Sequence, residues 1–165
     1  MSLRGAELGK AGAVALAAIA LDQISKAIVR AQVLPGEQVD VFAGVHIVRV
    51  HNSGIAFGML EDAGSLVIVI AAIAFAALLS MFLLSAERRG LWLPVGLLAG
   101  GALGNLIDRL LRDPGWFRGG VVDFIDFQWF PIFNVADIEI TVGVILLVAI
   151  YVLQPEPEPK ASEGG

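Results

Sequence analysis

Four long apolar stretches limit what this chain can fold into. They cover about residues 11–29, 65–84, 91–111 and 134–153, and each has about the 20 residues that a helix needs to cross a bilayer core. Hydrophobic residues make up 57% of the chain and charged residues only 16%, whereas an ordinary soluble domain has about 25% charged residues. The sequence therefore predicts a single integral membrane domain over residues 1–165. Its fold class is an all-α membrane protein, with four transmembrane helices and a small β-rich extramembrane cap.

The connecting segments predict where this cap lies. An even number of spans puts both termini on one side, together with the short connection that carries Arg88 and Arg89, and these arginines weakly favour the cytoplasm. On the other side, residues 31–64 alternate apolar and polar residues and predict short strands. Residues 112–133 are rich in Trp and Phe, which favour the membrane interface. Residues 154–165 are rich in Pro and Glu and predict a disordered tail. The alternative for the first apolar stretch is a cleaved signal peptide, although no convincing small-residue cleavage site follows it.

Polar residues recur on single faces of three predicted helices. At spacings of three or four residues stand Asp22 and Lys26 in the first helix, Asn105, Asp108 and Arg109 in the third, and Asn134, Asp137 and Thr141 in the fourth. Such residues are costly in a membrane and usually face the bundle interior or a water-filled cavity. All lie toward the cap end of their helices, so we expect them to converge. The alternative is structural, because ion pairs and asparagine side chains also join helices. Glu139 lies off this face and is expected to reach the lipid headgroups.

Two aspartates, Asp123 and Asp137, have no basic residue at helical spacing. If residues 121–127 are extended, Asp123 faces one side and Asp126 the other, where solvent is expected. Two carboxylates that meet in a low-dielectric site cannot easily both ionise, so one keeps a proton. This suits peptide hydrolysis, because the ionised group takes a proton from water and the protonated group hydrogen-bonds the scissile carbonyl.

Other chemistries have weaker support in the sequence. No Gly-x-Ser-x-Gly motif is present, and the two histidines, His46 and His51, lack zinc-binding spacing. The absence of cysteine excludes thiolate catalysis and cysteine metal sites. There is no basic stripe, so nucleic acid is not expected as a partner. We therefore expect neither a metal nor another cofactor.

Five motifs in order resemble those of lipoprotein signal peptidase, also called signal peptidase II, a family of bacterial membrane aspartic proteases. They are "LDQISKAIV", "HNSGIAFGML", "GGALGNLIDRL", "GGVVDFIDF" and "FNVADIEIT", and they extend from about residue 20 to residue 145. The resemblance implies four helices in the bacterial cytoplasmic membrane, both termini in the cytoplasm, and an active site near the outer surface. The stretch 112–118, "RDPGWFR", is longer than the link expected there, which bears on the gating of the site.

Carried onto this sequence, the resemblance makes Asp123 and Asp137 the catalytic pair. Supporting or substrate-binding positions are Asp22, Lys26, Asn52, Gly54, Asn105, Asp108, Arg109, Asn134 and Ala136. The implied reaction removes the signal peptide of a diacylglyceryl-modified prolipoprotein, just before the lipidated cysteine, by a monomer in contact with membrane lipid. Two alternatives remain: a small proton-coupled membrane transporter, whose acid would lie deeper in a helix, and a non-catalytic scaffold that binds lipoproteins.

Overall fold

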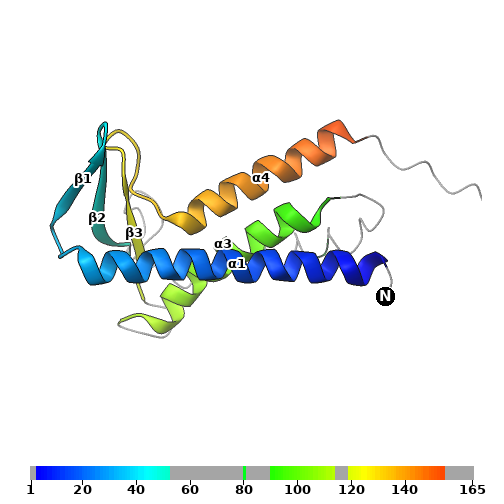
Figure 1. Cartoon of the computed structure of the whole chain (residues 1–165), viewed down its shortest axis with the longest axis horizontal. Coiled ribbons are helices and arrows are strands. Elements are labelled where there is room, and N and C mark those ends of the chain that lie inside the picture. The colour runs from blue at the N-terminus through cyan, green and yellow to red at the C-terminus, as the bar shows by residue number, and fades with distance from the viewer. Residues whose placement is uncertain (1–2, 53–79, 81–89, 114–118, 155–165) are drawn as a thin grey trace, which may run out of the picture.

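The computed structural model describes residues 3–52, 80, 90–113 and 119–154 and contains helices and one small sheet (Figure 1). In chain order the elements are α1 (Leu3–Gln32), β1 (Gln38–Phe42), β2 (Val45–Asn52), α3 (Trp92–Leu111), β3 (Val121–Asp126) and α4 (Val135–Leu153). Helices therefore form at three of the four predicted stretches, and strands form where alternation predicted them. The apolar stretch 65–84, apart from the helical Ser80, and the tail beyond residue 154 lie outside the described residues.

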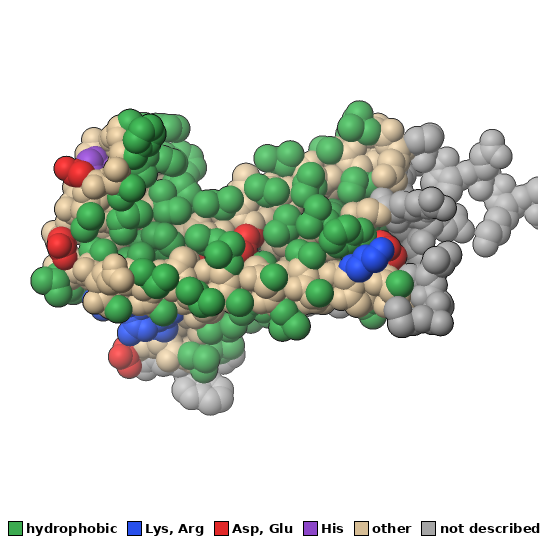
Figure 2. All heavy atoms as spheres, viewed as in Figure 1, with side chains coloured by type: hydrophobic (Ala, Val, Ile, Leu, Met, Phe, Trp, Pro, Cys, Tyr) green, Lys and Arg blue, Asp and Glu red, His purple; other side chains and the backbone are tan. Residues whose placement is uncertain are grey.

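Burial in this protein is inverted relative to a soluble domain. Large apolar side chains are exposed along α1 and α4, for example Leu16 at 70% and Leu153 at 78%. Charged side chains such as Asp22, Lys26 and Asp108 are fully buried. Figure 2 shows hydrophobic side chains spread over the outer face of the helices. Gly5–Gln32 and Val135–Leu153 are both long and apolar enough to cross a membrane. This distribution fits helices whose outer surface meets lipid and whose interior holds the polar groups.

Small residues allow the helices to pack closely. A Cβ atom at Gly100 of α3 would lie 2.9 Å from the carbonyl oxygen of Ala15 in α1. On the next face of α3, a Cβ atom at Gly101 would lie 2.5 Å from the carbonyl oxygen of Ala136 in α4. Interfaces between membrane helices are typically built this way, because small residues let two backbones approach. The close approach brings the polar residues of α1, α3 and α4 within hydrogen-bonding distance.

The three strands form one antiparallel sheet at the C-terminal end of α1, in the order β1-β2-β3 (Figure 1). Ala43 and Gly44, with φ of 40° and 83°, make the two-residue turn between β1 and β2, a position that favours left-handed residues. One face of the sheet packs on the end of α1, where Val29 of the helix and Val33 just after it form a buried cluster with Val122 and Phe124. This cluster fixes β3, and with it Asp123, against the end of α1.

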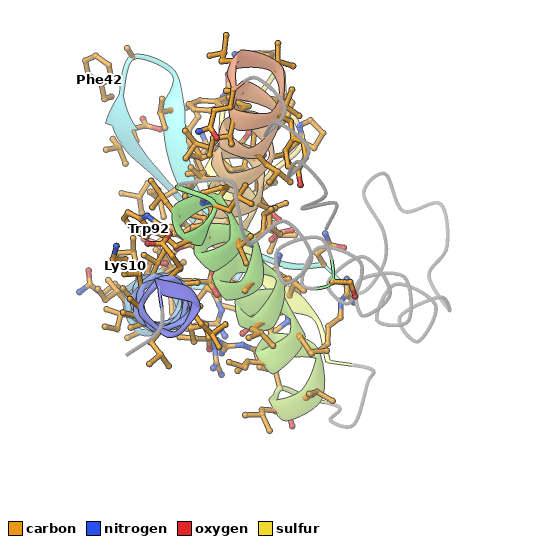
Figure 3. All side chains as sticks on the ribbon, turned by 90° about the vertical axis from the view of Figure 1, so that its right-hand side faces the viewer. Lys10, Phe42 and Trp92 are labelled. Atoms are coloured by element: carbon orange, nitrogen blue, oxygen red, sulfur yellow. The ribbon has the colours of Figure 1, made fainter. Side chains whose placement is uncertain are left out.

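The opposite end of the helices has a different polar contact. The Lys10 ammonium of α1 lies 5.7 Å from the centre of the Trp92 ring at the start of α3. Figure 3 shows these two residues side by side, whereas Phe42 at the tip of the β1–β2 hairpin points away from the sheet. The α1–α3 pair is thus held at one end by a cation–π contact and at the other by the buried polar cluster described below.

Candidate active site

The two predicted aspartates come from different elements and are joined by one asparagine. Asp123 lies in β3 and is 4% exposed, and Asp137 lies in the first turn of α4. Asn134, fully buried, donates from Nδ2 to Oδ1 of Asp123 at 2.6 Å, and its backbone N–H donates to Oδ2 of Asp137 at 3.0 Å. One residue therefore binds both carboxylates and sets how they lie relative to each other.

Burial and hydrogen bonds act on Asp123 in opposite directions. Burial raises the pKa of Asp123 to about 6, and the nearby charge of Asp137 adds to the rise. The side-chain amides of Asn52 and Asn134 limit it, because their hydrogen bonds favour the ionised form. Asn52, at the end of β2, donates to Oδ2 at 2.9 Å. The carboxyl of Asp123 can consequently gain or lose a proton near neutral pH, as acid–base catalysis requires.

Asp137 is oriented by the start of its own helix. Asn134 is the N-cap of α4 and accepts from the backbone N–H of Asp137, while the Asp137 side chain accepts from the backbone N–H of Asn134. This reciprocal arrangement is a capping box. The Asn105 side chain of α3 donates to the other oxygen of Asp137 at 3.1 Å. The positive end of the α4 helix dipole also lies next to this carboxylate and favours its charge.

A buried lysine connects this pair to α1. Lys26 is fully buried, and its Nζ lies 2.9 Å from Oδ2 of Asp22 and 2.9 Å from Oδ2 of Asp108. The same ammonium donates to Oδ1 of Asn105 at 2.8 Å, and Asn105 in turn donates to Asp137. Lys26 thus forms ion pairs with two carboxylates and, through Asn105, orients a third.

The outer layer of the cluster ties the backbone of α4 and β3 to α1 and α3. Asp22 accepts from the backbone N–H of Ala136 at 3.2 Å, and Asp108 accepts from the backbone N–H of Val122 at 3.3 Å. A Cβ atom at Gly104 would lie 2.5 Å from Oδ2 of Asp22, so the glycine leaves the space that this carboxylate occupies. These bonds hold the elements that carry the two aspartates.

The structure brings most of the predicted site residues together. Those found in the cluster are Asp22, Lys26, Asn52, Asn105, Asp108, Asn134, Ala136 and the two aspartates, with Arg109 buried where it interacts electrostatically with Asp123 and Asp108. Gly54 lies outside the described residues. The Asp22–Lys26 ion pair, expected from their spacing, is confirmed.

Three features differ from the prediction. Glu139 does not reach outward but is 6% exposed, because its Cβ packs near Gly101 at the α3–α4 contact. Thr141 is exposed, and its hydroxyl donates to the carbonyl of Asp137 within the helix, at 2.7 Å, so it does not join the cluster. Asp108 does more than neutralise its neighbour in sequence, because it forms ion pairs with Lys26 and Arg112.

Two members of the cluster were missed from the sequence. Arg112 pairs with Asp108 and donates to the Gln23 side chain at 3.2 Å. Gln23 also donates to Asp108 at 3.1 Å and to the backbone carbonyl of Gly104 at 3.0 Å. The spacing of four residues between Asp108 and Arg112 was a signal for the first. Gln23 had no such signal, because its partners other than the adjacent Asp22 come from α3 and the residue after it.

Comparisons with known proteins place the chain among bacterial membrane enzymes. The family model of signal peptidase (SPase) II matches residues 14–153. The lipoprotein signal peptidase of Syntrophomonas wolfei subsp. wolfei is 40% identical over 146 residues, covering 88% of this chain and 94% of that protein. The lipoprotein signal peptidase of Rhodococcus jostii is 37% identical over 143 residues, covering 85% of this chain and 71% of that protein. A solved structure described as a bacterial membrane enzyme superposes with a TM-score of 0.76 at 34% identity, covering 93% of this chain and 96% of that one.

Fold and site together define a helical membrane protein with paired carboxylates between a small sheet and the helix ends. With these matches over most of its length, the chain belongs to the signal peptidase II family. It is therefore a peptidase by family, and the family membership suggested by the five motifs is confirmed.

Proposed function

We propose that this protein is an aspartic endopeptidase that removes the signal peptide from diacylglyceryl-modified prolipoproteins, and cleaves just before the lipidated cysteine. The observation that carries the proposal is the pair of carboxylates of Asp123 and Asp137, each held by amide donors and both bound by Asn134. The relatives named lipoprotein signal peptidase supply the class of substrate.

The geometry supports a reaction in which water is the nucleophile. One carboxylate of the pair is ionised and takes a proton from water, while the other carries a proton and donates it to the scissile carbonyl oxygen. Burial raises the pKa of Asp123 to about 6, so Asp123 can hold a proton near neutral pH. As the carbon–nitrogen bond breaks, the proton taken from water passes to the leaving amine, and the hydroxyl formed from the carbonyl oxygen returns its proton to the pair. No acyl-enzyme is needed in this scheme.

Membrane placement follows from the same proposal. The chain is a multi-pass protein of the bacterial cytoplasmic membrane, in which α1, α3, α4 and the apolar stretch 65–84 each cross the bilayer. Both termini are cytoplasmic, and the sheet forms the cap on the outer side. The exposed apolar faces of α1 and α4 support lipid contact. The diacylglyceryl group of the substrate would stay in the bilayer and hold the scissile bond at the level of the aspartate pair. The protein acts as a monomer with a single membrane domain, followed by the tail predicted for residues 154–165.

Cleavage of a lipidated prolipoprotein by the purified protein in detergent tests the proposal. Asp123→Asn and Asp137→Asn should each abolish cleavage, because asparagine keeps the shape but cannot exchange the proton. Asp126→Asn is the matched control, since Asp126 lies on the same strand but its Oδ1 only accepts from the backbone N–H of Gln128. It should retain substantial activity. Full activity of either dyad variant, or no cleavage by the unaltered protein, would contradict the proposal.

A further inference from the structure

A chain of hydrogen bonds crosses the cap sheet on the face that carries His46. His46 of β2 is the cross-strand partner of Asp40 on β1 and of Asp126 on β3, so the three side chains lie on one face. Its Nδ1 lies 2.6 Å from Oδ1 of Asp40, and its Nε2 lies 2.8 Å from the side-chain amide nitrogen of Gln128. The His46 side chain is only 12% exposed, although Asp40 is 83% exposed. The imidazole is therefore the most buried member of a polar cluster that takes no part in the proposed cleavage reaction.

Gln128 is the residue through which this cluster reaches the catalytic segment. Its φ of 65° is left-handed, a conformation that residues other than glycine rarely adopt. Its backbone N–H donates to Oδ1 of Asp126 at 2.6 Å, and its side chain contacts His46. A strained backbone of this kind persists only where surrounding contacts hold it, and such residues cluster at functional sites. Gln128 lies in the segment that joins Asp123 to Asp137.

The far end of that segment is held by its backbone. Ile125 donates to the carbonyl of Phe133 at 2.8 Å, and Phe133 donates back to Ile125 at 3.2 Å. The next residue is Asn134, which binds both catalytic carboxylates. The segment is therefore a short closed loop that is anchored at Phe133 by backbone bonds and at Gln128 by His46. Gln128 thus lies inside this closed loop, and Asn134 follows the loop directly.

We propose that His46 is a positioning residue for the aspartate pair: it acts through Gln128 and helps to set the placement of Asn134. The inference rests on the proposed peptidase function. Because a carboxylate only accepts, the contact with Asp40 is made by Nδ1–H, and Nε2 then accepts from the Gln128 amide. The Gln38 amide nitrogen lies 2.9 Å from the same Nδ1, so Gln38 competes with Asp40 for this ring nitrogen.

Charged groups face the His46 ring from both strands that pair with β2. They are Asp40 from β1 and Asp126 from β3, and the Gln38 side chain adds an uncharged amide whose nitrogen lies 2.9 Å from Nδ1.

Steady-state cleavage by the full chain in detergent, with a lipidated prolipoprotein at pH 5 to 8, tests the inference. His46→Phe keeps a ring but removes both nitrogens, and should lower kcat at pH 8 about fivefold, the size of one lost hydrogen bond. His46→Gln, whose amide can both donate and accept but does not titrate, should restore kcat at pH 8. His51→Phe, at the other histidine of the same strand, is the control and should change neither kcat nor its pH dependence.

A double substitution separates positioning from packing. Gln128→Ala should lower kcat as much as His46→Phe does, and the two together should cost no more than either alone, because both remove one contact. Additive losses overturn the proposal, and so does a kcat of His46→Phe equal to that of the unaltered protein at every pH. A loss that tracks a lowered thermal midpoint and is not rescued by His46→Gln also overturns it, since the ring would then only fill space. Failure of the peptidase function itself is distinguishable, because the unaltered protein would then cleave nothing.

Discussion

Replacement of Lys26 by methionine is expected to destabilise the protein strongly. Methionine has a similar length, but it leaves the buried carboxylates of Asp22 and Asp108 without the ammonium that lies 2.9 Å from each. It also removes the donor to Asn105. Breaking a buried ion pair by removing one partner costs about 3–5 kcal/mol, because an uncompensated charge remains in the interior.

The remaining contacts place the expected loss at the low end of this range. Asp108 keeps its ion pair with Arg112, and Asp22 keeps its bond from the backbone N–H of Ala136. We therefore expect a loss of about 3 kcal/mol in the free energy of unfolding. In a chain of this size each kcal/mol lowers the midpoint by about 2–4 °C, so thermal unfolding in detergent should show a fall of roughly 6–12 °C.

Lys10→Met provides the matched control for this measurement. Lys10 also pairs with an acid on α1, Glu7 at 2.9 Å, but its side chain is 54% exposed. Exposed ion pairs contribute about 0–1 kcal/mol, and the cation–π contact of Lys10 with Trp92 adds about 0.5–1 kcal/mol, so the midpoint should fall by only about 1–8 °C. If Lys26→Met shifts the midpoint no further than Lys10→Met does, the buried network does not stabilise the fold and the reasoning is refuted.

Three further predictions concern pH and packing. Asn52→Ala removes a donor that favours ionised Asp123, so the pKa of that carboxyl should rise above about 6. The limb of the pH–rate profile that reports Asp123 should then move to higher pH, and an unmoved limb contradicts the assignment. Because the pKa of Asp123 is raised to about 6 from about 3.9 in the unfolded chain, stability should fall as pH rises between these values, and denaturant titrations should show that Asp123→Asn removes this fall. Gly100→Val should lower the thermal midpoint, because a Cβ atom there would lie 2.9 Å from the Ala15 carbonyl oxygen. Gly12→Val, where a Cβ atom would have nothing within 4 Å, should leave the midpoint unchanged, and equal shifts would refute the close-packing argument.

Local rules were sufficient for much of the fold. Residues 91–111 and 134–153 were predicted as helices and form α3 and α4 within one residue at each boundary, because an apolar run of bilayer length can satisfy its backbone only as a helix or in a closed barrel. Alternation in residues 31–64 likewise predicted the strands that β1 and β2 form. The ion pair of Asp22 with Lys26 depends only on a four-residue spacing and was predicted correctly.

Partners on different elements could not be predicted in this way. The spacing of Asp108 suggested Arg109, but its carboxylate meets Lys26 of α1 and Arg112, and Gln23 enters the same cluster from α1. These contacts depend on how α1 is rotated against α3, which the glycine–alanine contacts between the two helices determine. Glu139 shows the same limit, because its burial follows from the close packing at Gly101.

The sequence by itself determined which polar residues the chain carries and which of them stand at helical spacing, because the helical period is a local property. It also determined the family, since the motifs are read along the chain. Tertiary structure alone decided that Asn134 binds both Asp123 and Asp137, and that His46 reaches Gln128. The physical reason is that a hydrogen bond needs two atoms within about 3 Å. Between residues of separate elements, that distance is set by helix packing and strand register, which only the folded chain specifies.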